Sequence, residues 1–205
     1  LEGSTKYINC DTLRIRKDGT VIGVDKNTGN YDELNISLET FIISKDAFDK
    51  INELQKVVSS AYNFRQMINY CIREKLLNIK AYNHKEEVYP ILSFDDYVNI
   101  SFKLLPYEER CKLFDPEWPI YTTTHNTPPS LYGPDADVRN SFIANGAIIN
   151  GKVENSIISR GVIVDKGAEI KNSIIFTKTH IGENKKINYV FTDKVVKVTE
   201  VDELS

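Results

Sequence analysis

The aliphatic residues that follow residue 137 recur at a spacing that neither a helix nor a straight strand explains. The first six, five residues apart, are Val138, Ile143, Ile148, Val153, Ile158 and Ile163. On an α-helix a step of five rotates a side chain by about 140°, so these residues would not form one apolar stripe. On a straight strand an odd step would send alternate residues into water. We therefore predict short extended segments separated by corners, each sending one aliphatic side chain into a shared core.

A longer repeat lies over this spacing. The pattern aliphatic-x-Asn-Ser includes Asn140, Asn155 and Asn172, at intervals of 15 and 17 residues. Glycines stand between the aliphatic residues, where the chain has to turn. Imperfect six-residue repeats are typical of a parallel β-helix, in which each coil stacks on the next at about 4.8 Å. We predict about four such coils, with Asn and Ser side chains stacked at the corners and open ends that need a cap or a partner.

The composition excludes several classes of function. The chain has 205 residues and a formal net charge of -3, without a basic stretch that would bind nucleic acid or an anionic membrane. It has no apolar run long enough to span a membrane and no signal peptide at its start. Cys10, Cys71 and Cys111 are far apart and lack a Cys-x-x-Cys spacing. We therefore predict reduced thiols and a cytoplasmic location, with no nucleic acid and no membrane among the partners.

Residues 1–114 show alternating strand and helix patterns. The dipeptide Asp18-Gly19 between two β-rich runs predicts a hairpin. Strands are predicted at residues 13–15, 21–24, 38–43, 77–82 and 87–92. Helices are predicted from Ser44 or Asp46 to Val58, from Phe64 to Leu76 and from Ser93 to Leu105. The alternation indicates an α/β layer, but it lacks the glycine-rich phosphate loop of a complete nucleotide-binding domain, so we expect only the C-terminal part of one.

The composition changes between residues 115 and 136. This stretch holds five of the seven prolines, which exclude a helix or a central strand. We predict an extended linker here, with Trp118 and Ile120 lying against the surface of a domain. The sequence thus divides into an α/β domain at residues 1–114, a linker at 115–136 and a β-helix with a C-terminal tail at 137–205.

Three features occur together in this order: the segment Leu-Phe-Asp-Pro-Glu-Trp-Pro-Ile at residues 113–120, the pair Pro128-Pro129 and the Asn-Ser corners. Together with the α/β pattern before them, they resemble bacterial glucose-1-phosphate adenylyltransferase (ADP-glucose pyrophosphorylase) over essentially the whole chain. The resemblance implies the C-terminal part of a Rossmann-like nucleotidyltransferase domain, followed by a short left-handed parallel β-helix of hexapeptide repeats. These enzymes join ATP and glucose 1-phosphate into ADP-glucose and diphosphate for glycogen biosynthesis, with magnesium, as tetramers.

The resemblance also implies candidate binding residues. Lys26 corresponds to the lysine of an acidic-Lys-Pro motif, and Ser37 to the serine of a sugar-binding Ser-x-Gly. Lys26 would meet a sugar phosphate as a point charge and Ser37 would offer a hydroxyl, although an exposed turn lysine and a strand-edge serine are the simpler interpretation. Glu39 in place of the glycine would bring an extra anion to an anionic substrate. Three basic residues are candidates for binding an anionic effector, or are solvated corner charges: Arg139, Arg160 and Lys178.

One departure from the family concerns the metal. The family's aspartate that holds the catalytic magnesium corresponds to Pro90, which has no side-chain oxygen. Magnesium that is held by one or two carboxylates and by substrate phosphates does not tolerate the loss of a ligand. The resemblance therefore implies a non-catalytic regulatory subunit without a metal or cofactor of its own, the magnesium belonging to a catalytic partner. We expect a hetero-oligomer with that catalytic adenylyltransferase subunit, a tetramer in this family, or self-association through the β-helix.

Three alternatives stay open at this point. The chain could be a catalytically competent sugar-phosphate nucleotidyltransferase in which Asp95 or Asp96 replaces the lost carboxylate. It could be a hexapeptide-repeat acyltransferase with His180 as general base, although a histidine beside a corner glycine is more often a solvated turn residue. It could also be a structural oligomerisation module without a regulatory role.

Overall fold

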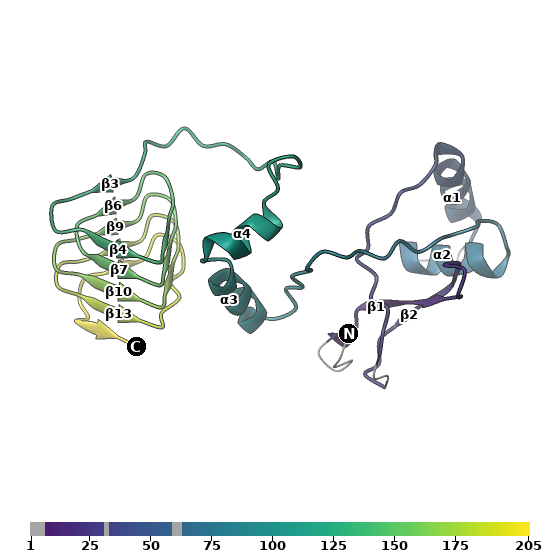
Figure 1. The fold of residues 1–205 in the computed structure, drawn as a ribbon, viewed down its shortest axis with the longest axis horizontal. Helices are drawn as coiled ribbons and strands as arrows, with labels where there is room; N and C mark the ends of the chain where they lie inside the picture. Colours follow the sequence, from purple (N-terminus) through teal and green to yellow (C-terminus); the bar gives the residue numbers. More distant parts are fainter. Residues whose placement is uncertain (1–6, 31–32, 59–62) are drawn as a thin grey trace. The chain divides into compact units, whose positions relative to one another are not determined.

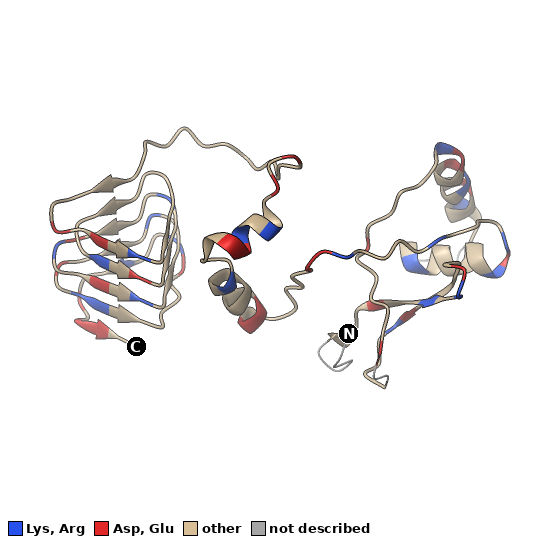
Figure 2. Cartoon of the chain, in the orientation of Figure 1, with Lys and Arg blue, Asp and Glu red and all other residues tan. Residues whose placement is uncertain are grey.

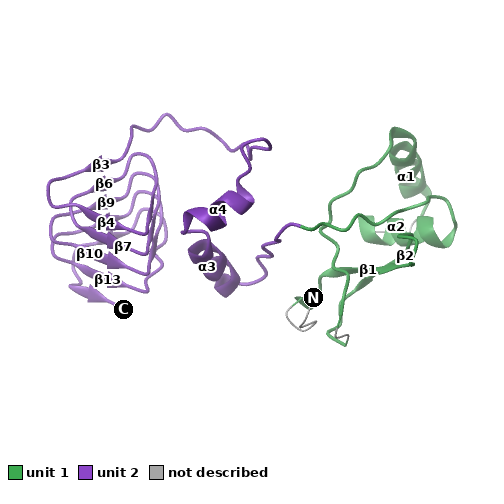
Figure 3. Cartoon of the chain, viewed as in Figure 1, with its two compact units in different colours: residues 1–85 green, residues 86–205 purple. Residues whose placement is uncertain are grey.

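A computed structural model describes residues 7–30, 33–58 and 63–205. The chain divides into two compact units, residues 1–85 and residues 86–205 (Figure 3). The first unit contains a hairpin and two helices, and the second contains two helices and a stack of coils (Figure 1). No helix in these described ranges is both long enough and apolar enough to cross a membrane.

The first unit is built on an antiparallel hairpin. β1 (Asp11–Ile15) pairs with β2 (Val21–Lys26). Gly19 in the turn has a φ of 81°, a conformation that glycine adopts without strain. The hairpin predicted from Asp18-Gly19 is therefore confirmed.

Two helices complete the core of this unit. α1 (Lys45–Val57) begins after Ser44, whose side chain caps the first turn. α2 (Phe64–Arg73) begins at a capping box formed by Asn63 and Gln66. Both helices were expected from the sequence, and the apolar face of α2 is buried as predicted except at Phe64, which is exposed. The core that the helices form with the hairpin consists of Val21, Val24, Ile51, Met67, Ile68 and Cys71.

Three of the predicted strands are wrong. Residues 38–43 and 87–92 form no strand, and residues 77–82 contribute a single bridge, from Lys80 to Thr20. A strand forms where a neighbouring chain segment supplies hydrogen-bond partners and a surface to pack on. The β-rich composition of these segments does not reveal whether such a neighbour exists.

The second unit begins with two short helices. α3 (Phe94–Lys103) starts as predicted after Ser93, whose hydroxyl accepts a hydrogen bond from the Asp96 amide at 3.0 Å. Sequence reasoning does not find α4 (Tyr107–Leu113), which begins after Pro106 and is too short to show a period of apolar residues.

Residues 114–130 contain no helix and no strand. Trp118 is 83% exposed, and Ile120 is also exposed. The prediction that these two side chains lie against a domain surface is therefore wrong. The prolines around them prevent the regular structure that would place both side chains on one packed face.

Residues 131–204 form a parallel β-solenoid of about four turns, which confirms the predicted β-helix (Figure 1). Sheet A contains β3 (Leu131–Tyr132), β6 (Ile148–Ile149), β9 (Ile163–Val164), β12 (His180–Ile181) and β14 (Lys197–Val198). Sheet B contains β4 (Asp137–Arg139), β7 (Lys152–Glu154), β10 (Glu169–Lys171), β13 (Lys186–Asn188) and β15 (Glu203–Leu204). Sheet C contains β5 (Phe142–Ile143), β8 (Ile157–Ile158) and β11 (Ile174–Ile175). The chain passes from sheet A to B to C in each coil, so β3, β4 and β5 make up coil 1, and β6, β7 and β8 make up coil 2.

The interior of the solenoid is filled by aliphatic side chains such as Val153, which is completely buried. Two of the predicted inward positions are wrong. Ile148 and Ile163 lie half-buried on the outer face of sheet A, and the residues that follow them, Ile149 and Val164, point inward. The corner that leads into sheet A is one residue longer than a uniform step of five implies, and this shifts the inward position.

The corner between sheets A and B sets the length of each coil. Two residues, Asn150 and Gly151, join β6 to β7, whereas four residues join β9 to β10 and β12 to β13. This difference accounts for the intervals of 15 and 17 residues between the repeats. A Cβ atom at Gly151 would lie 2.3 Å from the carbonyl oxygen of Ala168, so the short corner accepts only glycine.

Aromatic side chains attach α3 to sheet C. The rings of Phe94 and Phe191 meet edge to face with centroids 5.4 Å apart. The ring centroids of Tyr97 and Phe176 are 6.5 Å apart. Phe94 and Tyr97 are three residues apart, so they share one face of the helix. The sequence-based division assigns α3 to the N-terminal domain, whereas these contacts connect it to the solenoid.

Candidate functional site

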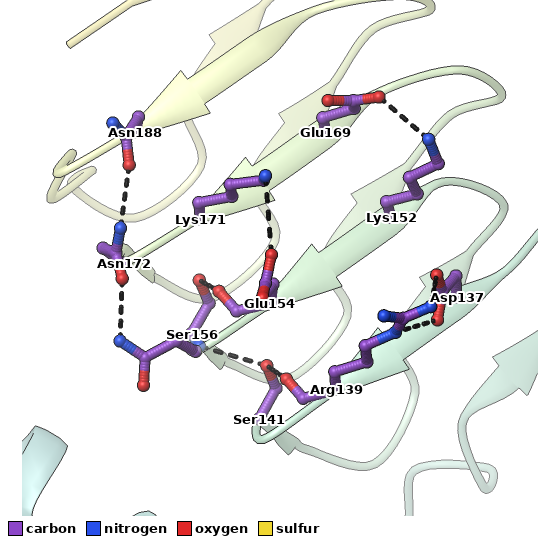
Figure 4. A network of polar contacts seen from close by, with 11 residues as sticks. Asp137, Arg139, Ser141, Lys152, Glu154, Ser156, Glu169, Lys171, Asn172 and Asn188 are labelled. Atoms are coloured by element: carbon purple, nitrogen blue, oxygen red, sulfur yellow. Dashed lines mark hydrogen bonds and ion pairs between the residues drawn. The ribbon is translucent and has the colours of Figure 1, made fainter.

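Stacked asparagines form the corner between sheets B and C. Asn140, Asn155 and Asn172 have φ values of 41°, 46° and 48°, the left-handed conformation that asparagine tolerates. Their amides form a chain: Asn140 donates to Asn155 at 3.0 Å, and Asn155 donates to Asn172 at 2.7 Å. Asn172 continues the chain to Asn188 at 3.0 Å, although Tyr189 takes the left-handed position in that coil (Figure 4). The predicted stack of asparagines is confirmed.

The serines beside these asparagines connect one coil to the next. The Ser156 amide donates to the hydroxyl of Ser141 at 3.0 Å (Figure 4). The Ser173 amide donates to the hydroxyl of Ser156 at 3.1 Å. The Ser156 hydroxyl in turn donates to the Glu154 carbonyl at 2.7 Å. Ser156 and Ser173 are completely buried, so the Ser156 hydroxyl satisfies, at Ser173, a backbone amide that water does not reach.

The outer face of sheet B is a ladder of alternating charges, which we call the charge ladder (Figure 2). In the register of the strands, its first column is Asp137, Lys152, Glu169, Lys186 and Glu203. Its second column is Arg139, Glu154 and Lys171. Each of these charges therefore faces an opposite charge in a neighbouring coil, and the second column ends where Lys171 faces the neutral Asn188.

Measured contacts support this arrangement. Lys152 Nζ lies 3.1 Å from Glu169 Oε1, and Lys171 Nζ lies 3.5 Å from Glu154 Oε2 (Figure 4). The hydrogen bond from Lys152 lowers the pKa of Glu169. All four side chains are partly exposed, so each pair adds little to stability. Opposite charges at neighbouring positions instead favour one register of the coils.

Arg139 belongs to this ladder. Its guanidinium donates to both carboxylate oxygens of Asp137, at 3.0 Å and 2.9 Å. This pairing raises the pKa of Arg139. An anionic effector would therefore have to compete with the Asp137 carboxylate for the Arg139 guanidinium.

The other two candidate effector residues lie together at the corner between sheets C and A. The Lys178 amide donates to the Arg160 carbonyl at 2.9 Å, and both side chains are exposed. The Val195 amide donates to the Thr177 carbonyl, so Val195 lies at the same corner in the next coil. Lys194, which precedes Val195, therefore also lies at this corner. Sequence reasoning missed Lys194 because the fourth repeat is the least regular one. The structure thus brings Arg160 and Lys178 together and places Arg139 on another face of the solenoid.

In the first unit Lys26 and Ser37 lie in one row across β1. Asp11 is opposite Lys26 in the hairpin, and the Ser37 amide donates to the Asp11 carbonyl at 2.8 Å. Residues directly opposite one another share a face of a sheet, so all three side chains project from the same side. Arg65 Nε lies 3.3 Å from the Asp11 carboxylate, and this ion pair is mostly shielded from water.

Sequence reasoning missed Asp11 and Arg65. One signal was present: Arg65 is in the first turn of α2, where a cation is disfavoured by the helix dipole. The ion pair with Asp11 compensates Arg65 for this unfavourable position.

The carboxylates considered as replacements for a metal ligand lie at the start of α3. Asp96 Oδ2 accepts hydrogen bonds from the Ser93 hydroxyl at 2.9 Å and the Leu92 amide at 3.3 Å. Asp95 is an exposed residue of the same turn. Within the described residues no group of three or more His, Cys, Asp or Glu side chains is arranged to hold a metal ion.

His180 is not the solvated turn residue that its neighbouring glycine predicted. It is in β12 and half-buried, and its Nε2 lies 2.6 Å from Asp165 Oδ2. The aliphatic Ile163 and the basic Lys197 are its neighbours in the register of sheet A. A histidine held by a carboxylate is geometrically able to act as a base, although the contact also has a purely structural use.

A shallow groove lies at the corner between sheets A and B. It follows from the short corner of coil 2, which leaves space between the longer corners on either side. Lys166 Nζ lies 3.2 Å from Asp135 Oδ2 across this space. The residues that line the groove are Asp135, Gly151, Lys152, Lys166, Gly167, Glu169, Glu183 and Asn184.

Comparison with known proteins agrees with this geometry. The family described as GlmU-like, C-terminal hexapeptide matches residues 131–204. Glucose-1-phosphate adenylyltransferase of Clostridium perfringens (strain SM101) is 42% identical over 78 residues, which cover 38% of this chain and 20% of that protein. The enzyme of the same name from Acetivibrio thermocellus is 32% identical over 139 residues, 68% of this chain and 33% of that protein. The chain is a relative of the glucose-1-phosphate adenylyltransferases.

The glycogen biosynthesis protein GlgD of Bacillus subtilis (strain 168) is a further relative, 39% identical over 127 residues, 62% of this chain and 37% of that protein. The chain therefore spans 20% to 37% of the length of these three relatives. Among the residues compared with the adenylyltransferase family, Glu39 has a φ of 53°. This is a left-handed conformation, which glycine adopts without strain and glutamate rarely does.

Proposed function

We propose that this chain is a non-catalytic, regulatory subunit in the cytoplasmic synthesis of ADP-glucose from ATP and glucose 1-phosphate, a step of glycogen biosynthesis. The observation that carries the proposal is Pro90, which stands where the resemblance expects the magnesium-binding aspartate. A proline side chain supplies no oxygen to a cation, and magnesium sites with few carboxylates depend on each of them. The magnesium would be held by a catalytic partner subunit.

Regulation in this proposal acts through assembly. A rigid solenoid that binds a catalytic subunit more tightly in one of its conformations shifts that subunit toward this conformation. Couplings of this kind commonly amount to about 1–3 kcal/mol, or about 5- to 150-fold in affinity. The contacts of the buried serines and of the corner asparagines support the proposal, because hydrogen bonds from coil to coil favour one arrangement of the solenoid.

Lys26 and Ser37 are, in this proposal, the remainder of a sugar-phosphate site. They share one face of the sheet, and the ion pair between Asp11 and Arg65 fixes the strand between them. The exposed Glu39 lies two residues after Ser37, and its negative charge weakens the binding of an anion there. Arg160 and Lys178 are proposed as an effector contact, because they lie together at one corner.

The test is an assay of ADP-glucose formation with the full-length subunit alone, with a catalytic subunit from the same organism, and with both. We expect no activity from this subunit alone, and a change in the effector response or kcat/KM of the catalytic subunit when both are present. The Lys26→Met variant is expected to reduce the dependence of that change on glucose 1-phosphate. An unaltered catalytic subunit in the mixture, with no change in mass, would contradict the proposal.

A catalytically competent enzyme is the second candidate. The exposed Asp95 favours it, because among the described residues no capping bond like that of Asp96 restrains its carboxylate. ADP-glucose formation by the subunit alone, abolished by Asp95→Asn, would establish this second function in place of the first. An Asp46→Asn variant, which changes an equivalent first-turn carboxylate in α1, serves as its control.

A further inference from the structure

One lysine near the end of the solenoid is covered. Among the residues that the structure describes, Lys185 is the only Lys, Arg, Asp or Glu that is buried. It directly precedes β13, and the residues in that place in the earlier coils are Ala136, Gly151 and Ala168. Ala168 is completely buried. Lys185 thus occupies a covered position that the earlier coils give to small residues.

The Lys185 ammonium is held by a residue of the following coil. Its Nζ lies 2.8 Å from Asp202 Oδ1, and the exposed fractions of the two side chains are 11% and 96%. Asp202 directly precedes β15, so it takes in that coil the place that Lys185 takes before β13. The hydrogen bond from Lys185 lowers the pKa of Asp202 and favours the charged carboxylate. The lysine therefore has a covered stem and a charge that one exposed carboxylate compensates.

Residues 199–205, which we call the terminal flap, are attached to the solenoid by few contacts. All of them are exposed except Leu204, which is half-buried. β15 pairs with β13 over two residues, and the Lys186 amide donates to the Asp202 carbonyl at 2.9 Å. A segment with little buried apolar surface and few backbone hydrogen bonds opens locally at a low free energy. The pair of Lys185 and Asp202 is therefore one of the few contacts that hold the flap on β13.

We propose that the terminal flap is a latch, which the ion pair of Lys185 and Asp202 holds closed. In the closed state the flap covers the ammonium, and the carboxylate compensates its charge. In the open state the flap leaves β13, and water solvates the ammonium instead. A closed flap without the carboxylate would cover an uncompensated charge, which is costly. The carboxylate therefore decides between the two states.

Opening of the latch frees one edge of a strand. β13 pairs with β10 on one side and with β15 on the other, so departure of the flap leaves the second side of β13 unpaired. Ile187 is 2% exposed in the closed state, and Leu204 lies opposite it in the register. An unpaired edge beside an apolar residue is a surface to which another strand is added. The latch thus controls whether the edge of β13 is available.

Replacement of the lysine by methionine separates this latch from a local role of Asp202 in its own corner. Methionine keeps an unbranched apolar stem and carries no charge. In Lys185→Met the closed flap covers no charge, so closure no longer depends on Asp202. A role of Asp202 that does not act through Lys185 would persist in the presence of the methionine.

Hydrogen exchange at single amides, measured by NMR on the whole chain, tests the proposal. The Lys186 amide is bonded to the flap, whereas the Glu169 amide donates to the Lys185 carbonyl at 2.8 Å, one coil earlier. Asp202→Asn is expected to accelerate exchange at Lys186 by about tenfold or more, because it removes the charge partner of the ammonium. Exchange at Glu169 is expected to stay unchanged.

Two further variants provide the controls. Glu200→Gln removes an exposed carboxylate from the same flap, and it is expected to leave exchange at Lys186 unchanged. Lys185→Met combined with Asp202→Asn is expected to exchange at Lys186 within about threefold of Lys185→Met alone, which has the same neighbouring sequence at that amide.

Three results would overturn the proposal. The first is an Asp202→Asn variant whose Lys186 amide exchanges no faster than in the wild type, or no faster than in Glu200→Gln. The second is an equal acceleration at Lys186 and Glu169, which would show that the coils open together. The third is a double variant that exchanges about tenfold faster than Lys185→Met. None of these measurements uses substrate or a partner subunit, so their outcome is independent of the proposed role in ADP-glucose synthesis.

Discussion

Several non-glycine residues adopt left-handed backbone conformations, and Val195 is the most unusual of them. Its φ is 61°, and its side chain is exposed at the corner between sheets C and A. The equivalent corners of earlier coils use Gly146 and Gly161, which adopt this conformation without strain. For a β-branched residue it is a true outlier, because the branched Cβ lies close to the backbone.

Replacement of Val195 by asparagine should therefore stabilise the chain. The left-handed conformation costs most residues about 1–2 kcal/mol, and asparagine less, so Val195→Asn is expected to raise the free energy of unfolding by about 1 kcal/mol. Urea denaturation of the purified chain measures the change. Val201→Asn makes the same chemical change at an exposed position that is not left-handed, and it should alter stability by less than about 0.5 kcal/mol. Equal effects of the two variants would refute the prediction.

Among the elements, the corner between sheets B and C carries the most specific contacts. The Ser156 hydroxyl accepts from the Ser173 amide and donates to the Glu154 carbonyl, all in a position without access to water. The same contacts recur in successive coils, because the aliphatic-x-Asn-Ser pattern recurs with them.

Ser156→Ala is expected to lower the free energy of unfolding by about 1–3 kcal/mol, since it leaves the buried Ser173 amide without an acceptor. Ser141→Ala is the matched variant. It removes the acceptor of the Ser156 amide at the open end of the stack, where water can take its place, so a smaller loss is expected. Thermal or urea denaturation of both variants gives the comparison, and a Ser141→Ala loss as large as that of Ser156→Ala would contradict it.

The elements also show what the sequence is able to predict. The hairpin and two helices carry their own local signals, namely Asp18-Gly19 and the capping residues Ser44 and Ser93, and α2 shows a periodic apolar face. The solenoid repeats its signal in every coil. The false strand at residues 38–43 lacks such a signal, because a strand forms only beside a pairing segment, which composition does not reveal. The unrecognised α4 is too short for its apolar residues to show a helical period.

The candidate sites were predictable only in part. The neighbourhood of Lys26 and Ser37 depends on the pairing of Thr12 with Ile36, a contact between segments that no local pattern connects. The charge ladder depends on the register of coils of unequal length. Arg139 was a candidate for binding an anionic effector because the sequence did not show that Asp137 lies beside it on the same outer face of the sheet.

At the scale of the whole molecule, the segment between α4 and the solenoid differs from everything around it. Residues 114–130 form no helix or strand, and Tyr121 is 90% exposed. Proteases need a segment of backbone that can leave its hydrogen bonds and enter their active site, which favours exposed irregular segments.

Chymotrypsin is therefore expected to cut the native chain after Tyr121 before it cuts within the solenoid. Tyr189 is a natural comparison, because it is also exposed but its amide donates to the Lys171 carbonyl within the solenoid. Mass spectrometry of a time course should show the product that begins at Thr122 before any cut at Tyr189. Tyr121→Ser should slow this cut, and early cleavage at Tyr189 would show that the coil opens more easily than its contacts imply.

The two-residue corner at Asn150 and Gly151 has a consequence for engineering. Coil 2 keeps its rungs aligned with its neighbours although its outer path is shorter, because backbone pairing and the interior aliphatic side chains fix the alignment. The number of residues in the corner between sheets A and B can therefore differ from coil to coil without a change in how the coils stack. A foreign peptide could therefore be inserted into one of the four-residue corners between sheets A and B. The choice of coil would set its position along the solenoid axis.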